Sequence, residues 1–363
     1  MKKIAVVGSN GLPANYGGWE TLTEYLVEYL ASRFMFTVFC STYSHADQID
    51  KYKGAKLEYL RLRANGVQSI LYDIVSMWKA RNTHDIILVL GVSGGLFLPF
   101  IKPFSSAKFI VNIDGLEWKR AKWNRFIKFY LKLSERVAVK SADRIIGDNE
   151  IIRQYISTRY KRDSFYLSYG GDHVSASNID PGALTAYVNS TEKFAFKVCR
   201  IEPENNVEMI LEAYINSERR FKLIIVGNWA NSRYGLELRQ KYDDFRNVIL
   251  LDPIYDLKKL DAFRSRALVY LHGHSAGGTN PSLVEAMNLS LPIFAFRCDF
   301  NIETTKNGCD YFRNSAELDV LFDRIEGDNE WLVKNGKKME EIAEEFYRWK
   351  IIAFGYKSLF ELE

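Results

Sequence analysis

The sequence predicts an α/β protein made of two doubly wound domains, each a mostly parallel sheet covered by helices. Short β-rich runs alternate with helical segments from the first residues onward. This alternation stops at a polar segment containing proline and glycine, residues 172–193, and then starts again. The length of 363 residues suits two domains of ordinary size, each able to bury its own core.

The first half carries the strand runs of one predicted domain, residues 1–175. Between its first two strands, Trp19, Leu22 and Leu26 recur three or four residues apart, which predicts an amphipathic helix. Strands are predicted at IAVVG (4–8), FTVFC (36–40), DIILVLG (85–91), KFIVNID (108–114), RIIGD (144–148) and SFYLSYGG (164–171).

The second half repeats the pattern and predicts a domain over residues 190–340. The amphipathic run at 339–360 predicts a C-terminal helix, assigned to residues 341–363, that packs back on the first domain. With parallel strands in both halves, we expect a cleft at the carboxyl ends of both sheets. The strands are predicted at FAFKVCR (194–200), KLIIVGN (222–228), NVILLD (247–252), ALVYLHG (267–273) and LPIFAF (291–296).

Composition excludes several classes of protein. With 47% hydrophobic and 26% charged residues the chain is predicted to be globular and ordered, and its net charge of +4 is too small to indicate nucleic-acid binding. The four cysteines lack zinc or disulfide spacing, which favours a reducing cytoplasm. The longest apolar stretch, at 86–101, is interrupted by glycine and proline, so we expect a buried strand, a turn and a helix start rather than a membrane span.

The stretch HGHSAGGTNPSLVEAM, residues 272–287, predicts a strand, a glycine loop and a helix. Pro281 suits a first helical turn and Asn280 suits the cap before it. Unpaired N–H groups at such a helix start attract phosphate, and glycines let the backbone come close. Glu285, one turn deeper, could accept hydrogen bonds from ribose hydroxyls; a tight turn with a solvated glutamate is the alternative. The predicted phosphate-binding residues are Gly277, Gly278, Thr279 and Asn280.

Two further features are predicted to lie at the cleft. Arg200 follows the strand at 194–200, where a guanidinium can hold a diphosphate with two hydrogen bonds; an ordinary surface ion pair is the alternative. In the first domain, Gly17 and Gly18 precede a helix and could present N–H groups to a phosphate, although an ordinary turn fits equally well. The loop lacks the G-x-G-x-x-G spacing of dinucleotide sites, which disfavours an NAD enzyme.

Four segments together resemble the retaining glycosyltransferases of the large family four, whose GT-B fold has two facing Rossmann-like domains. Within it, the chain is most similar to the bacterial capsule and cell-wall rhamnosyltransferases. The resemblance covers nearly the whole chain and implies a nucleotide-sugar donor in the second domain, an acceptor in the first, and neither cofactor nor metal. The segments are VCRIEPENN (198–206), GGTNPSLVEAM (277–287), GLPANYGGWE (11–20) and NIDGLEWKRAKW (112–123).

The resemblance assigns roles to individual residues, with two departures. Glu285 matches the second glutamate of the family's pair, expected on the ribose, but the first falls on Gly277. Arg200 matches the family's diphosphate arginine, whereas Asn205 occupies the place of its lysine. Arg297, after the strand at 291–296, is therefore a candidate second cation.

Catalysis is predicted to rest on Asp114, Arg200 and Glu285. Asp114 ends a strand where the family often has a catalytic histidine, although a turn aspartate capping the next helix is the alternative. The resemblance implies front-face attack with retention, in which a donor phosphate oxygen takes the acceptor's proton. His272 and His274 have no third ligand beside them, so no metal site is predicted.

Residues 117–144 carry nine Lys or Arg against three acids, a local net charge of +6. Phe126, Tyr130, Leu133 and Val137 form an apolar stripe at helical spacing, beside a basic side with Lys122, Arg125, Lys132, Arg136 and Lys140. This composition favours contact with an anionic membrane surface, although a normal surface helix packing on its sheet is the alternative. The residues predicted to face membrane or acceptor are Trp118, Lys119, Arg120, Lys122, Trp123 and Arg125.

The combined prediction is an enzyme that moves L-rhamnose from dTDP-L-rhamnose onto a lipid-linked saccharide in surface polysaccharide synthesis. We expect it in the cytoplasm, peripherally associated with the inner face of the cell membrane, without nucleic acid as a partner. The alternative is an isomerase of the nucleotide-sugar 2-epimerase kind, which shares the architecture but needs cleft carboxylates, one of which Gly277 removes. Oligomeric state stays open.

Overall fold

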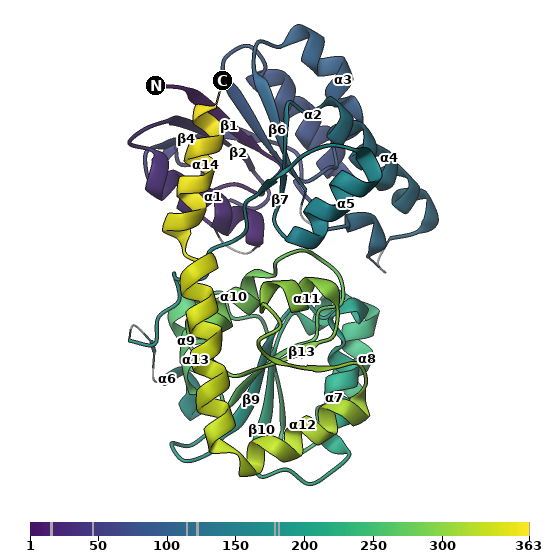
Figure 1. The fold of residues 1–363 in the computed structure, drawn as a ribbon, viewed down its shortest axis with the longest axis vertical. Helices are drawn as coiled ribbons and strands as arrows, with labels where there is room; N and C mark the ends of the chain where they lie inside the picture. The colour runs from purple at the N-terminus through teal and green to yellow at the C-terminus, as the bar shows by residue number, and fades with distance from the viewer. Residues whose placement is uncertain are drawn as a thin grey trace. The chain divides into compact units, whose positions relative to one another are not determined.

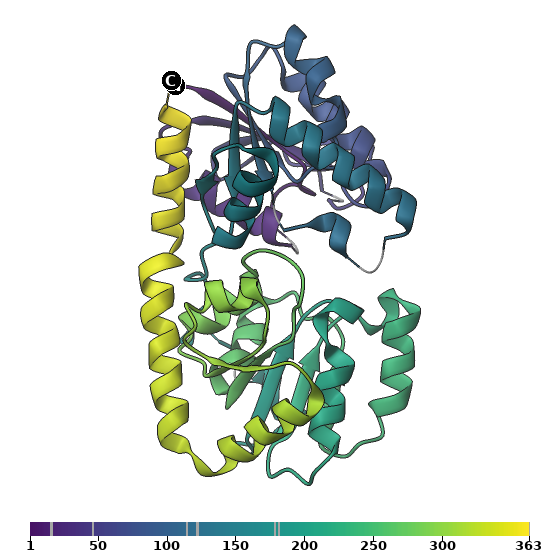
Figure 2. The same cartoon turned by 45° about the vertical axis from the view of Figure 1, so that its right-hand side comes forward.

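The computed structural model describes residues 1–14, 17–45, 47–113, 115–120, 123–177, 179–180 and 182–362. The chain divides into two compact units (Figure 1 and Figure 2). Unit 1 contains Met1–Tyr169 and Trp349–Glu363, and unit 2 contains Gly170–Arg348. Among the described residues, no helix has both the length and the apolar character needed to cross a membrane.

Unit 1 is built on a sheet that has eight strands among the described residues, in the order β3-β4-β2-β1-β5-β6-β7-β8. All neighbours pair in parallel except β3 and β4, which form an antiparallel hairpin. The central strands are buried on both faces, as expected for a parallel sheet covered by helices. The strands are β1 Lys3–Val7, β2 Met35–Ser41, β3 Lys51–Tyr52, β4 Ala55–Leu60, β5 Ile86–Leu90, β6 Lys108–Ile113, β7 Arg144–Gly147 and β8 Phe165–Tyr166.

Helices cover both sides of this sheet: α1 and α14 lie on one side, and α2, α3 and α4 on the other (Figure 1). The described α-helices are α1 Gly18–Leu30, α2 Gln68–Ala80, α3 Leu98–Ile101, α4 Arg125–Ser141, α5 Glu150–Tyr160 and α14 Trp349–Glu361. Short 3₁₀ turns occupy η1 Gly95–Phe97, η2 Lys102–Phe104 and η3 Glu117–Lys119.

Helix α14 completes unit 1 although it ends the chain. The ring of Trp349 stacks on Tyr25 of α1 with centroids 4.5 Å apart. Phe360 packs edge-on against Phe34 at 5.5 Å, and Asn112 of β6 donates a hydrogen bond of 2.8 Å to the Tyr356 hydroxyl. These buried aromatic contacts make α14 part of the core of unit 1.

Unit 2 is built on a parallel sheet of six strands among the described residues, in the order β11-β10-β9-β12-β13-β14. The strands are β9 Phe194–Val198, β10 Lys222–Val226, β11 Val248–Leu251, β12 Val269–His272, β13 Ile293–Phe296 and β14 Asp310–Phe312. In Figure 1, α7, α8 and α12 lie on one side of the sheet, and α9, α10 and α13 on the other.

The α-helices of unit 2 include α10, the helix predicted from the glycine loop. They are α6 Gly182–Thr185, α7 Val207–Ile215, α8 Arg233–Tyr242, α9 Leu257–Arg266, α10 Pro281–Asn288, α11 Asp299–Thr304, α12 Ser315–Gly327 and α13 Asn329–Phe346. The described 3₁₀ turns are η4 Pro203–Asn205 and η5 Trp229–Asn231.

The amphipathic run at 339–360 is two helices rather than one. Helix α13 ends at Phe346, and α14 begins at Trp349. The side chain of Tyr347 between them is fully buried in unit 2, where its hydroxyl donates to the Thr304 carbonyl at 2.9 Å. The break therefore assigns the first part of the run to unit 2 and the second part to unit 1.

Candidate functional site

The start of α10 has the geometry expected of an anion-binding helix terminus. Asn280 caps the helix, because its Oδ1 accepts from the Ser282 N–H at 3.1 Å, and Pro281 stands in the first turn. Both predicted roles are confirmed. Gly277 has φ of 134°, a backbone conformation that L side chains rarely adopt, and Gly278 and Thr279 behind it are buried. Just before the helix start, the loop therefore adopts a positive-φ backbone conformation that favours glycine.

The glycine loop is fastened to the turn that follows β9. The N–H and the hydroxyl of Ser275 both donate to the Glu204 carbonyl, each at 2.9 Å. Asn206 donates its side-chain amide to the Gly273 carbonyl at 2.8 Å. These contacts fix the loop after β12 relative to the loop after β9, so the two can act as one surface.

Asn205 serves this turn instead of presenting a charge. Its side-chain amide donates to the Arg200 carbonyl at 2.7 Å, and the residue is 3% exposed. The amide therefore closes the turn on which Arg200 sits. At the position where the resemblance expects a lysine, the chain has a structural asparagine.

Arg200 lies exposed beyond the carboxyl end of β9. Among the residues that the structure describes, its guanidinium has no ion-pair partner. Strands β9, β12 and β13 are neighbours in the sheet, so Arg200, the glycine loop and Arg297 follow the same edge. The Arg297 guanidinium lies over the Tyr311 ring, 5.8 Å from its centroid. One free arginine and one stacked arginine therefore follow the edge that carries the helix start.

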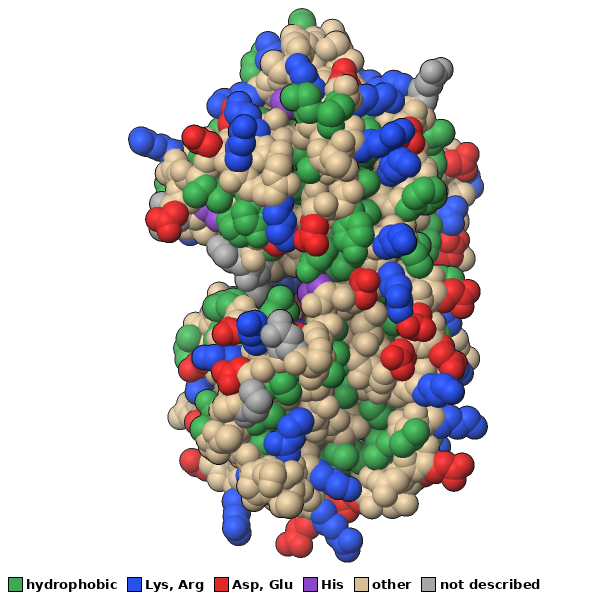
Figure 3. All heavy atoms as spheres, turned by 90° about the vertical axis from the view of Figure 1, so that its left-hand side faces the viewer, with side chains coloured by type: hydrophobic (Ala, Val, Ile, Leu, Met, Phe, Trp, Pro, Cys, Tyr) green, Lys and Arg blue, Asp and Glu red, His purple; other side chains and the backbone are tan. Residues whose placement is uncertain are grey.

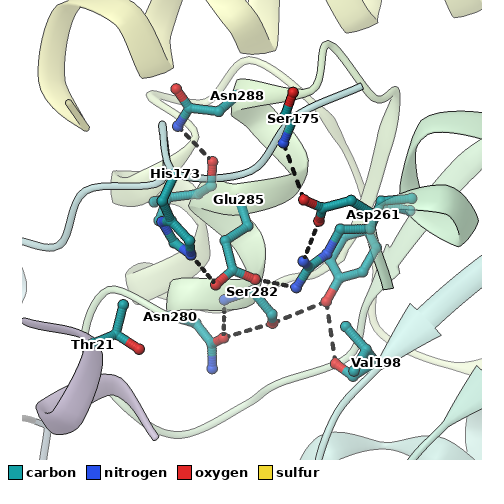
Figure 4. A network of polar contacts seen from close by, with 12 residues as sticks. Thr21, His173, Ser175, Val198, Asp261, Asn280, Ser282, Glu285 and Asn288 are labelled. Atoms are coloured by element: carbon teal, nitrogen blue, oxygen red, sulfur yellow. Dashed lines mark hydrogen bonds and ion pairs between the residues drawn. The ribbon is translucent and has the colours of Figure 1, made fainter. Parts of the chain in front are cut away.

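Glu285 is held in a buried polar network (Figure 4). One carboxylate oxygen lies 3.3 Å from His173 Nε2, and the other pairs with Arg264 of α9. Arg264 also pairs with Asp261 at 2.9 Å, and Asp261 accepts the Ser175 N–H at 3.0 Å. The network ties helices α9 and α10 to the segment that opens unit 2.

Glu285 and Arg264 each favour the charged form of the other. Burial by itself raises the pKa of Glu285, but the positive charge of Arg264 and the hydrogen bond from His173 bring that pKa below its ordinary value. Burial likewise lowers the pKa of Arg264, while Glu285 and Asp261 raise it overall. Glu285 is therefore an ionised carboxylate at neutral pH, ready to accept hydrogen bonds.

Glu285 has acceptor positions that its two described ion-pair partners do not use. An ionised carboxylate offers about four acceptor positions, of which Arg264 and His173 use one each. The Glu285 side chain is 12% exposed, so it can be reached from outside. A pair of neighbouring hydroxyls is the kind of group that the remaining acceptor positions suit.

A buried lysine lies beneath the same edge. Lys197 of β9 is fully buried, and its Nζ makes one long hydrogen bond, 3.4 Å, to the Leu271 carbonyl. Burial lowers the pKa of Lys197, and burial together with Lys197 brings the pKa of His272 well below its ordinary value. The rings of His272 and His274 stack at 4.5 Å. In the described part of the chain, no three His, Cys, Asp or Glu side chains gather as a metal site.

The predicted site residues of unit 1 are only partly described. Gly17 is the N-cap of α1, with φ of 126°, and Gly18 begins the helix. Within the described residues this helix start has no side-chain cap, and Glu20 turns back to accept from the Asn10 N–H at 2.6 Å. Asp114, the predicted catalytic aspartate, lies outside the described residues, as does Lys122.

The tryptophans predicted to face membrane or acceptor are hydrogen-bonded within unit 1. Trp118 donates to Glu135 at 2.9 Å, and Trp123 donates to Glu117 at 3.1 Å. Arg120 pairs with Glu117 at 2.6 Å, and the Lys119 Nζ lies over the Trp118 ring, 5.7 Å from its centroid. Arg125 is exposed at the start of α4.

Three members of the Glu285 network were not among the predicted site residues: His173, Asp261 and Arg264. A signal for two of them was present, because Asp261 and Arg264 stand three residues apart on a helix, the spacing of an intrahelical ion pair. His173 lies in the polar segment 172–193, where the predicted alternation of strands and helices stops. Its contact with Glu285 joins residues more than a hundred positions apart, so no local sequence pattern predicts it.

Comparison with family models divides the chain in the same way as its fold. Residues 1–172 match a family described as a domain of unknown function (DUF1972). Residues 186–349 match the family of glycosyl transferases group 1. Most of the second unit therefore matches a glycosyltransferase group 1 domain. Comparison with curated proteins gives no match.

Solved structures with similar folds cover both units. Sucrose-phosphate synthase from Thermosynechococcus elongatus has a TM-score of 0.82 at 16% identity, with 99% of this chain and 98% of that one covered. HepE from Anabaena, in complex with UDP-glucose, has a TM-score of 0.78 at 15% identity over 100% of both chains. A glycosyltransferase from Rickettsia africae has a TM-score of 0.70 at 12% identity, covering 99% and 97%. The predicted fold, two α/β domains with parallel sheets in the GT-B architecture, is confirmed.

Proposed function

We propose that this chain, whose residues 186–349 form a glycosyltransferase group 1 domain, transfers L-rhamnose from dTDP-L-rhamnose to a lipid-linked saccharide. The observation that carries the proposal is the start of α10, where the loop at Gly277 precedes a capped helix terminus. The same sheet edge carries Arg200, whose guanidinium has no ion pair within the described ranges. A diphosphate suits this arrangement, because helix N–H groups and an arginine both bind phosphate oxygens.

The same residues suit the chemistry of sugar transfer. When the bond from the anomeric carbon to the diphosphate breaks, negative charge grows on the departing phosphate. Arg200 and the start of α10 stabilise that charge more in the transition state than in the bound donor, which is how a preorganised site accelerates a reaction. Glu285, kept ionised by Arg264, accepts the ribose hydroxyls and holds the nucleotide in place.

The choice of rhamnose and of a lipid-linked acceptor comes from the sequence resemblance. The solved structure of HepE contains UDP-glucose, which makes a UDP-sugar the competing donor. An experiment on this chain should therefore compare nucleotides and sugars separately. A panel of dTDP-L-rhamnose, dTDP-glucose, UDP-glucose and GDP-mannose does this.

Thermal shift tests the donor site directly, because a ligand that binds only the folded chain raises its melting temperature. At a donor concentration of 100 Kd the stabilisation is about 2.7 kcal/mol, or about 5–10 °C for a unit of this size. We expect dTDP-L-rhamnose to give the largest shift. Incubation with and without a lipid-linked saccharide then distinguishes transfer, which needs the acceptor, from isomerisation, which does not.

Arg200→Ala is the matched test of the site. Loss of a charged hydrogen-bonding group should weaken donor binding about 10- to 150-fold while leaving the melting temperature without donor unchanged. Arg246→Ala is the control, because Arg246 is also exposed but precedes β11, at the opposite edge of the sheet. Equal donor binding by both variants, or no shift with any nucleotide sugar, would refute the assignment.

A further inference from the structure

Helix α4 packs on unit 1 through an unusual face. The side chains it buries are Leu131, Ser134, Glu135, Ala138 and Val139, two of which are polar. The Ser134 hydroxyl donates to the Val92 carbonyl at 2.5 Å and accepts the Leu96 N–H at 2.9 Å. Hydrogen bonds to the loop after β5 therefore anchor the middle of the helix.

Glu135 fixes the rotation of the helix even more firmly. Its carboxylate is fully buried and accepts three hydrogen bonds: from Trp118 at 2.9 Å, from Tyr155 at 2.7 Å and from Tyr160 at 2.6 Å. A buried carboxylate that lost these donors would be strongly destabilised, so α4 cannot roll about its axis without breaking them. The face that meets solvent is thus set by polar contacts in the interior.

The apolar side of α4 is left outside. Phe126 is 86% exposed, Phe129 is 71% exposed and Leu133 is 38% exposed. Together with Tyr130 and Val137 these residues form one side of the helix, at a three- and four-residue spacing. Tyr130 of this stripe is half-buried, and its hydroxyl donates to the Ser93 carbonyl at 2.8 Å, so α4 combines a packed face with exposed apolar side chains. Its inner face is the one defined by Ser134 and Glu135.

More aromatic residues stand exposed on the elements beside α4. Phe100 of α3 is 68% exposed, and Phe104 of η2 is 64% exposed. Helix α3 packs against α4, and Lys102 between these two phenylalanines donates to the Ser141 carbonyl at the end of α4, at 2.9 Å. The segment 86–101 was predicted to hold a buried strand, a turn and a helix start, and it contains the buried strand β5, the 3₁₀ turn η1 and the helix α3. We call Phe100, Phe104, Phe126, Phe129 and Leu133 the aromatic surface.

A basic band accompanies the aromatic surface. The exposed or half-exposed cations of α4 are Arg125, Lys128, Lys132, Arg136 and Lys140. The single acid of the helix is Glu135, which is buried. The face of the molecule in Figure 3, which is the left-hand side of Figure 1, instead mixes acidic and basic side chains. The helix α4 therefore exposes cations beside its apolar side chains, and Asp143 just beyond its end is paired with Lys102 at 2.5 Å.

We propose that the aromatic surface and the basic band of α4 dock unit 1 on an anionic lipid bilayer. Exposed phenylalanines beside a row of cations form the pattern by which a helix lies in the headgroup region, apolar side chains inserted and cations at the lipid phosphates. The inference deepens the proposed function and rests on it in one respect: a lipid-linked acceptor is reached only at a bilayer.

Charge favours a bilayer over a second copy of the chain. A two-fold dimer through this surface would bring the same basic band of each copy close to its counterpart, with no exposed acid on α4 to neutralise it. Anionic lipid headgroups supply the missing negative charge. A second copy therefore stays as an outcome of the test.

Vesicle sedimentation with the full chain tests the proposal. We expect binding to vesicles of phosphatidylcholine with 30 mol% phosphatidylglycerol, weaker binding to phosphatidylcholine alone, and loss of binding as salt rises. Phe126→Ser with Phe129→Ser should reduce binding to the anionic vesicles at least tenfold. Arg136→Gln with Lys140→Gln should reduce it about 25-fold, because each cation near an anionic surface is worth about fivefold.

The matched control is Ile351→Ser with Phe354→Ser. These residues are 45% and 64% exposed on α14, which covers the other side of the same sheet. The control should bind vesicles like the wild type, and both pairs of substitutions should leave the melting temperature unchanged. Equal vesicle binding by Phe126→Ser/Phe129→Ser and the control, or wild-type binding that ignores phosphatidylglycerol, would overturn the proposal.

Two further measurements separate the possible failures. If the wild type sediments as a dimer in lipid-free buffer and Phe126→Ser/Phe129→Ser is a monomer, the surface joins two copies and the bilayer proposal is wrong. The donor-induced thermal shift is measured on the same samples. A shift without vesicle binding refutes only this inference, and vesicle binding without any nucleotide-sugar shift refutes only the proposed donor site.

Discussion

Replacing Arg264 with methionine should destabilise unit 2 severely. Arg264 is fully enclosed and contacts both Glu285 and Asp261, whose side chains are 12% and 5% exposed. Methionine fills a similar volume but leaves two buried carboxylates without their shared cation. The cost of leaving a buried charge uncompensated is about 3–5 kcal/mol.

This cost translates into a measurable change in melting temperature. Unit 2 extends over Gly170–Arg348, a size at which each kcal/mol lowers the melting temperature by about 2–4 °C. Arg264→Met should therefore lower it by about 6–20 °C in calorimetry. Arg233→Met is the control, because Arg233 is 92% exposed and its pair with Glu237 is worth at most about 0.5 kcal/mol.

The pH dependence of the contribution of Glu285 to stability should also change sign in Arg264→Met. In the wild type the pKa of Glu285 is lowered, so its contribution to stability is present above the ordinary pKa of glutamate and is lost as pH falls through the lowered value. Without Arg264, burial raises the pKa of Glu285, and protonation relieves the penalty. The stability difference between wild type and Arg264→Met should therefore shrink as pH falls from 7 towards 4.

Adding Glu285→Gln to Arg264→Met should restore part of the lost stability, since it removes one of the two buried carboxylates that have lost their cation. Asp261 and His173 also face this pair and stay in place in all variants, so the comparison isolates Glu285. A loss below about 1 kcal/mol for Arg264→Met, similar to Arg233→Met, would show that the network is not a buried ion pair in solution.

Two other substitutions follow from the site. Lys197→Met should stabilise the fold by about 1–3 kcal/mol, because the buried amine has one long hydrogen bond and its pKa is lowered by burial. The gain in unfolding free energy, measured by urea unfolding, should grow as pH falls. A loss of unfolding free energy would instead reveal a stabilising role for the ammonium. Gly277→Ala should cost about 1–3 kcal/mol through backbone strain alone, since a Cβ there meets no atom within 4 Å. Gly327→Ala, equally open but without a positive φ, should cost nothing, and equal effects of the two substitutions would contradict this reading of Gly277.

The fold was predictable because its signals are local. Each predicted strand run contains an observed strand, since buried parallel strands are continuous apolar runs between glycines and helix starts. The missed strands are β3, β4 and β14, at or next to the sheet edges. In β4, Ala55–Leu60, lysine and glutamate alternate with apolar residues because one face is partly solvated. Edge strands bury less, so their sequences carry a weaker pattern.

The site was predictable only where its chemistry coincides with a backbone motif. Asn280, Pro281 and Gly277 were found because a helix start after a glycine loop has a sequence signature. The ion pair of Glu285 with Arg264 was missed, because it joins residues of different helices, and only packing decides which carboxylate meets which cation. The outward face of α4 was also left open, since an apolar stripe looks the same whether it meets a sheet or a bilayer.

The charge balance of the proposed donor site explains why the departure at Asn205 can be tolerated. A nucleotide diphosphate brings about two negative charges, and a lysine at that position would be one of two cations meeting them. Here the Asn205 amide is used within its turn, and burial lowers the pKa of Lys197, which is enclosed beneath this edge. Positive features that follow this edge include Arg200, the α10 terminus with about half a charge, Arg297 and Arg313. The Arg297 guanidinium lies over the Tyr311 ring, so turning it towards the second phosphate of a donor would cost one stacking contact.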